Sequence, residues 1–149
     1  MYDTDPAPGR TARTTTGRVL LTVTGLTTMC GAYIADWNDT HVFNPNWPPH
    51  AKFHNGQTMS TGLALGAATL YFVWGRRPWT YGTLQLATAC ASAYWITQMS
   101  SILYPGTAFT DPGCSRKAGQ PVMAGVTLAL NAAAFVAEKR RLRAARTGA

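Results

Sequence analysis

Residues 78–110 read PWTYGTLQLATACASAYWITQMSSILYPGTAFT, 33 consecutive residues without a charged side chain. Three more uncharged windows surround this one: 17 residues between Arg18 and Asp36, 23 between Lys52 and Arg76, and 20 between Lys117 and Glu138. A helix that crosses a bilayer needs about 20 mostly apolar residues. Windows of this length leave no polar face for water, which disfavours a soluble Ala-rich bundle. The pattern predicts an all-α fold, an integral membrane four-helix bundle in one domain.

Small and hydroxylated residues fill these windows, so the mean hydropathy of the chain is only −0.06. Small residues let helix backbones approach closely in lipid, where apolar burial supplies no driving force between helices. Gly62 with Gly66, and Gly125 with Ala129, have the four-residue spacing of such a contact. We therefore interpret the low hydropathy as the signature of tightly packed helices.

The basic residues predict the topology. We expect helices over residues 19–37, 48–74, 80–103 and 120–143, and 10 of the 13 Lys and Arg then lie on one side of the membrane. Cytoplasmic loops carry the Lys/Arg excess, so both termini should be cytoplasmic. The expected division is a disordered cytoplasmic tail at 1–17, a four-transmembrane-helix domain at 18–143 and a cytoplasmic tail at 144–149. The net charge of +7 then requires no nucleic acid, and the basic tail can contact anionic membrane lipids.

The first outer connection, residues 36–57 (DWNDTHVFNPNWPPHAKFHNGQ), contains all three histidines of the chain and two of its six carboxylates. Polar groups at membrane depth are costly and should turn toward the bundle interior or a cavity. On the third helix, Tyr94 and Gln98 share a face near the same end. These features together predict an outward-opening polar pocket. A single face of the second helix should line it with His50, His54 and Gln57.

Acid/base chemistry on a lipophilic substrate is one interpretation of this pocket. A buried carboxylate can hold a proton that a neighbouring histidine accepts, and aromatic faces can stabilise a carbocation. The candidate catalytic residues are Asp36, Asp39, His50 and His54. The candidate substrate-binding residues are Tyr33, Trp37, Asn38, His41, Trp47, Gln57, Tyr94, Trp95 and Gln98.

Two other interpretations of the same segment stay open. His50 and His54, four residues apart on a helix, could bind a metal ion together with His41 and Asp36 or Asp39. We expect no bound metal, because these residues do not form a recognised ligand spacing, and we expect no cofactor. Alternatively, the connection is a structural cap whose polar groups satisfy exposed helix ends.

Resemblances to known families help to choose between these interpretations of residues 36–57. Residues 44–55, NPNWPPHAKFHN, resemble a signature of small uncharacterised four-helix membrane proteins of bacteria and fungi, which implies no activity. The four-helix plan and Asp36 at the end of the first helix resemble the emopamil-binding-protein and sigma-receptor group. That group includes sterol double-bond isomerases, which use membrane-buried acidic residues. Lys52, His54 and Asn55 resemble a stretch of the microsomal glutathione transferases, whose Arg and Glu positions are missing here.

The sequence thus predicts a membrane enzyme that transfers protons in an isomerisation or cyclisation. The expected substrate is lipophilic and isoprenoid or sterol-like. A non-enzymatic lipid-binding, transport or accessory membrane subunit is the alternative, and a glutathione-transferase-like membrane enzyme is the third. Whether the chain forms a homo-oligomer is left open.

Overall fold

A computed structural model describes residues 14–75, 78–110 and 119–147. These ranges hold α1 (Thr16–Asp36), α2 (Pro49–Trp74), α3 (Tyr81–Ser100), a 3₁₀ turn η1 (Ser101–Leu103) and α4 (Gly119–Thr147). They contain no β-strand. The predicted all-α fold with four helices is therefore confirmed.

Local capping explains where the helices begin. The side chain of Thr15 accepts a hydrogen bond from the Arg18 amide, so α1 starts at Thr16, inside the predicted tail 1–17. The remainder of that tail, 1–13, lies outside the described residues. Pro49 opens α2 as predicted, and a capping box between Thr80 and Thr83 opens α3.

Two helix ends differ from the prediction. The regular part of α3 stops at Ser100, because the chain tightens into η1 before a turn at Gly106, whose φ is +80°. Instead of ending at 143, α4 continues to Thr147, because residues 144–146, Ala-Ala-Arg, are strong helix formers. Most of the expected tail 144–149 is thus helical.

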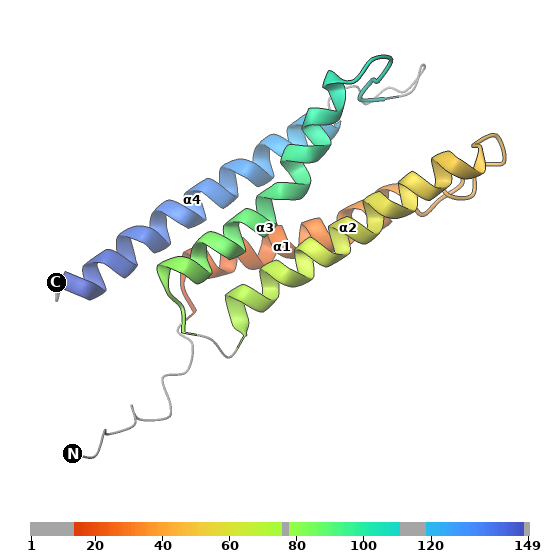
Figure 1. The fold of residues 1–149 in the computed structure, drawn as a ribbon. Helices are drawn as coiled ribbons and strands as arrows, with labels where there is room; N and C mark the ends of the chain where they lie inside the picture. The colour runs from red at the N-terminus through yellow and green to blue at the C-terminus, as the bar shows by residue number, and fades with distance from the viewer. Residues whose placement is uncertain (1–13, 76–77, 111–118, 148–149) are drawn as a thin grey trace.

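The helices form two antiparallel hairpins, α1 with α2 and α3 with α4 (Figure 1). Helix α1 contacts α2 and α4, and α3 contacts the same two helices, whereas α2 and α4 do not touch within the described residues. The hairpins diverge toward the end that carries the α1–α2 connection, which we call the histidine end. The start of α1, the start of α3 and the end of α4 lie at the other end, which we call the arginine end.

Glycines set the closest helix contact. A Cβ added at Gly66 would stand 2.5 Å from the carbonyl oxygen of Gly25, and one at Gly62 would stand 2.8 Å from that of Thr28. The predicted Gly62–Gly66 contact is therefore confirmed. The predicted contact of Gly125 with Ala129 is wrong, because both residues are exposed on the outer face of α4.

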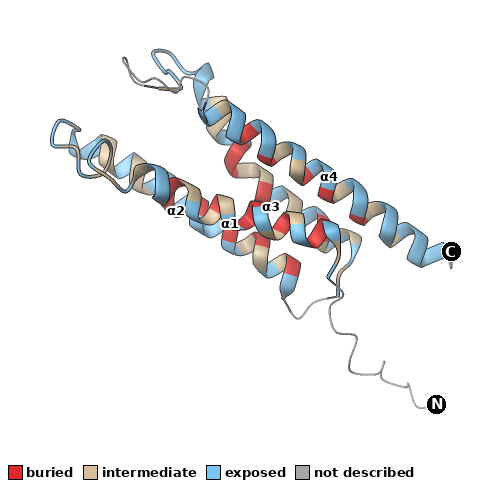
Figure 2. Ribbon diagram, turned by 180° about the vertical axis from the view of Figure 1, so that it is seen from behind, coloured by how far each residue is buried: buried red, intermediate tan, exposed pale blue. Residues whose placement is uncertain are grey.

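Buried residues lie along the middle of the bundle, whereas the tip of the α1–α2 hairpin is exposed or half-buried (Figure 2). The core combines apolar residues, such as Leu21, Leu84 and Ala91, with polar ones. Buried positions include hydroxyl and amide side chains, while many large apolar residues are exposed along all four helices. Helices α1 and α4 are long and apolar enough to cross a membrane, with only 28% and 22% of their apolar windows buried. The buried polar and charged residues of the described ranges are Arg18, Thr24, Thr28, Thr69, Thr127, Asn131 and Glu138.

Candidate functional site

Asp36 is the central carboxylate of the histidine end. It is the last residue of α1, and its side chain is 19% exposed. The Asn55 amide donates a hydrogen bond to Oδ2 at 2.8 Å, and His41 Nε2 lies 3.8 Å from Oδ1. The end of α1, the α1–α2 connection and the first turns of α2 thus meet at the half-buried Asp36 carboxylate.

A compact turn places His41 beside Asp36. The amide of Val42 donates to the carbonyl of Asp36 at 3.2 Å, and the Asn38 side-chain oxygen accepts hydrogen bonds from the amide and hydroxyl of Thr40. The ring of Trp47 packs edge-on against His41, with 5.1 Å between centroids. Polar turn residues of this kind replace the backbone bonds that a helix end leaves unmade.

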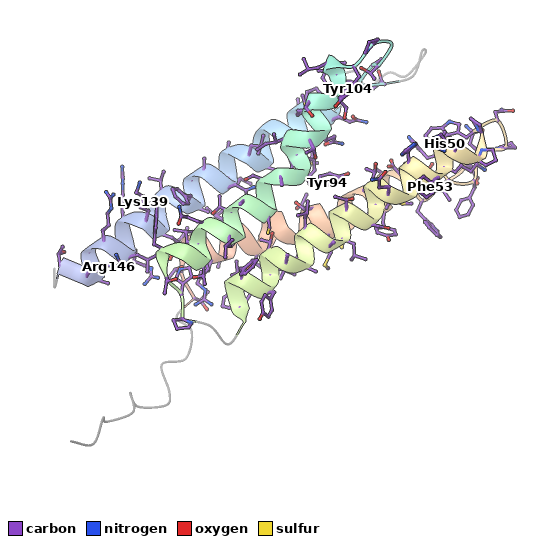
Figure 3. All side chains as sticks on the ribbon, viewed as in Figure 1. His50, Phe53, Tyr94, Tyr104, Lys139 and Arg146 are labelled. Carbon is purple, nitrogen blue, oxygen red and sulfur yellow. The ribbon has the colours of Figure 1, made fainter. Side chains whose placement is uncertain are left out.

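The other two histidines form a separate cluster on α2. His54 Nε2 lies 3.1 Å from His50 Nε2, and His54 Nδ1 lies 3.2 Å from the side-chain oxygen of Gln57. The predicted shared face is confirmed, but it is exposed. Asp36 contacts Asn55 rather than the candidate catalytic residue His54, because one helical position, about 100°, separates the two side chains of α2 and Asn55 faces α1. Figure 3 shows His50 and Phe53 at the tip of α2.

Tyr94 and Trp95, predicted to bind substrate, belong to the core. They are 6% and 5% exposed, and their rings pack edge-on at 5.3 Å. The Trp95 indole donates to the Thr28 hydroxyl at 2.8 Å, and Tyr94 lies against Gly62. Figure 3 shows Tyr94 between the hairpins. Gln98 is half-buried one turn further along α3, and its buried side-chain oxygen has no hydrogen-bond partner among the residues that the structure describes.

The remaining predicted residues lie near the surface. Asp39 is exposed and forms no ion pair in the described ranges. Trp37 is 57% exposed and stacks edge-on against Phe43 at 5.5 Å, with Tyr33 6.1 Å away on its other side. Across residues 14–75, 78–110 and 119–147, no group of three or more His, Cys, Asp or Glu side chains could hold a metal ion.

A second polar cluster, at the arginine end, was not predicted from the sequence. Glu138 is 2% exposed and accepts hydrogen bonds from Trp79 Nε1 at 2.7 Å, from Arg141 Nε at 3.0 Å and from the Thr15 hydroxyl. The guanidinium of Arg18, 4% exposed, lies over the ring of Trp79 at 5.1 Å. The sequence signal was available, since Glu138 is the only glutamate of the chain and follows an uncharged window.

Comparison with known proteins identifies the family. The model of a family of unknown function, DUF6640, matches residues 20–148. The chain belongs to this family. The match covers α2, α3, α4 and all of α1 except its start. It therefore includes both polar clusters apart from Thr15 and Arg18. No curated protein and no solved structure matches the chain.

Proposed function

We propose that this DUF6640 protein is a membrane-embedded enzyme that transfers protons to and from a lipophilic substrate at its histidine end. The observation that carries the proposal is the half-buried Asp36 carboxylate, held by Asn55 with His41 3.8 Å away. That separation exceeds a hydrogen bond, but acid–base pairs in ligand-free sites are often this loose. Adding a proton at one carbon of a double bond creates a cation at the other carbon, and removing a proton from the next carbon beyond that cation moves the double bond by one position without an oxidant or reductant.

The proposed location is a membrane crossed by all four helices. The exposed apolar residues and buried polar residues support this, because lipid solvates the outside while polar groups turn inward. Helices α2 and α3 do not reach the hydropathy of α1 and α4. The proposal that α2 and α3 also cross the membrane is supported by the absence of charged side chains from residues 53–75 and 78–110. The Lys/Arg distribution supports the proposal that both termini are cytoplasmic.

A lipophilic substrate would reach Asp36 from the membrane at the histidine end. Exposed aromatic residues lie at the tips of both hairpins, among them Trp37 and Phe53 on one side and Tyr104 on the other. Aromatic faces at this position would stabilise a developing carbocation beside the Asp36–His41 pair. In this arrangement the exposed His50 and His54 are not the proton-transfer groups. The exposed Asp39 is not a proton-transfer group either.

Deuterium exchange tests the proposal without a known substrate. Purified protein in nanodiscs is incubated in D₂O with a panel of unsaturated isoprenoid alcohols and sterols, and deuterium incorporation is followed by mass spectrometry. We expect incorporation by the parent protein and a loss of about 10²–10⁴-fold in Asp36→Asn and His41→Gln, because each removes a titratable group. Asp39→Asn, exposed and without an ion pair, is the matched control and should stay within about twofold.

Two results would count against the enzyme. Unchanged incorporation in a folded Asp36→Asn protein excludes this carboxylate from the chemistry. Retention of a lipid by the parent protein without any exchange would favour the alternative proposal, a non-enzymatic lipid-binding or transport subunit.

A further inference from the structure

The last turns of α4 concentrate positive charge at the arginine end. Within the described residues of this segment, Glu138 forms an ion pair with Arg141, through a contact of 3.0 Å. Among the described residues, no carboxylate forms an ion pair with the other cations of this segment. Surplus charge of this kind attracts anions, and it does so most strongly where several cations converge. The remaining cations are Lys139, Arg140, Arg143 and Arg146.

Helical spacing brings three of these cations to one face. Lys139, Arg143 and Arg146 stand at i, i+4 and i+7, whereas Arg140 points away from them. Together with Leu142 of the same helix and Tyr81 of α3, these three cations line a hollow of about 240 Å³. Figure 3 shows Lys139 and Arg146 at this end of α4.

Aromatic rings hold the first of these cations in place. The Lys139 ammonium lies 6.0 Å from the Tyr81 ring centroid and 5.8 Å from that of Phe135, within the range of cation–π attraction. Tyr81 is also the first residue of α3, so the positive end of that helix dipole adds to the same field. The carboxyl end of α4 lies at the same hollow and carries the negative end of its own dipole, so the positive potential comes mainly from the three cationic side chains.

The size and chemistry of the hollow fit a phosphate group. A volume of 240 Å³ is below the roughly 300–1,000 Å³ of pockets for drug-sized ligands, so it suits a small headgroup. Guanidinium groups bind phosphate through paired hydrogen bonds, and Lys adds a compact charge. Leu142 and the ring of Tyr81 offer an apolar wall for the carbon substituent of an ester. We propose that this hollow binds a phosphate ester, supplied either by an anionic lipid headgroup or by a soluble phosphate compound.

Binding of dihexanoyl phosphatidic acid to the purified full-length protein in maltoside detergent tests the site. We expect saturable binding in isothermal titration calorimetry, weaker by about tenfold or more in Arg143→Gln and in Arg146→Gln. Arg140→Gln removes the same charge from a position outside the hollow and should change the affinity less than twofold. Dihexanoyl phosphatidylcholine, which has no net charge, should bind at least tenfold more weakly.

The outcomes distinguish a specific site from diffuse attraction, and a lipid headgroup from a soluble phosphate. Equal weakening in Arg140→Gln and Arg143→Gln would show diffuse attraction without a site and would overturn the proposal, as would the absence of saturable binding. Inorganic phosphate and glycerol phosphate are then added as competitors. Displacement at millimolar concentration assigns the site to soluble phosphates, and failure to displace assigns it to the lipid headgroup. The site is remote from Asp36, so neither result depends on proton transfer there.

Discussion

Glu138 is a buried carboxylate that connects three separate parts of the chain. Its oxygens accept hydrogen bonds from Thr15 before α1, from Trp79 before α3 and from Arg141 on its own helix. Gly17 makes room for it, since an added Cβ would stand 2.4 Å from Glu138 Cγ. A buried charge is stable only while its hydrogen bonds are made. These contacts fix the start of α1 and the start of α3 against α4.

Replacing Glu138 by Gln should destabilise the protein by about 3 kcal/mol, because the charge is lost while several donors still point at the site. The free energy of unfolding is measured by denaturant titration of the purified protein. Arg140→Gln, on the exposed side of the same helix, is the control and should change it by less than about 0.5 kcal/mol. Equal stability of Glu138→Gln and the parent would contradict a structural role for this network.

The sequence predicted which types of residue gather at the histidine end better than it predicted which side chains contact one another. The concentration of His, Asp and Asn in residues 36–57 indicated where polar side chains would gather, and Asp36 does have polar partners there. The rotation of α2 decides whether Asn55 or His54 faces Asp36, and spacing within one helix does not determine rotation against another. The sequence marks Glu138 only as the end of an uncharged window, because its partners Thr15 and Trp79 lie 123 and 59 residues away along the chain.

Between elements, the α1–α2 interface depends on backbone contact. Gly66 faces the carbonyl of Gly25 and the backbone nitrogen of Met29, which an added Cβ would approach to 2.6 Å. Neither of these backbone atoms can rotate away as a side chain can. Such close approach is the usual means of strong helix association in lipid.

Gly66→Ala should therefore destabilise the protein by about 1–3 kcal/mol through overpacking. Gly56→Ala, in the same helix but with nothing within 4 Å, should instead be stabilising by up to about 1 kcal/mol, because Ala is the better helix former. The two midpoints of thermal unfolding should shift in opposite directions. Shifts of the same sign would exclude close backbone packing at Gly66.

The helix positions were predictable because long uncharged windows and Pro49 mark them directly. The start of α1 was harder to predict, because Thr15 lies in a run of threonines, any of which could cap the helix. The Gly125–Ala129 spacing matched that of Gly62–Gly66, yet only one pair faces a neighbouring helix. A small-residue spacing identifies a surface that can pack closely, and the rest of the bundle decides whether a helix covers it.

For the whole molecule, the two polar clusters stand at opposite ends of an apolar-faced bundle (Figure 3). One end gathers the histidines, Asp36 and Asp39. The other gathers Glu138 and six of the seven Lys and Arg residues that the structure describes. A bilayer separates such ends naturally, because its hydrocarbon core contacts only the middle of the helices. The asymmetry of charge between the ends then gives the molecule its expected orientation.

Reporter fusions test that orientation. The positive-inside rule predicts that a fluorescent protein fused after residue 149 is bright in the cytoplasm, while alkaline phosphatase inserted at 106–107 is active outside. Extraction of membranes with alkaline carbonate should leave the chain in the pellet, since helices that cross a bilayer are not released with peripheral proteins. Exchanging the two reporters should silence both. Release into the carbonate supernatant would contradict membrane insertion altogether, whereas phosphatase activity at the carboxyl terminus would reverse the orientation and place Asp36 and the histidines on the cytoplasmic side.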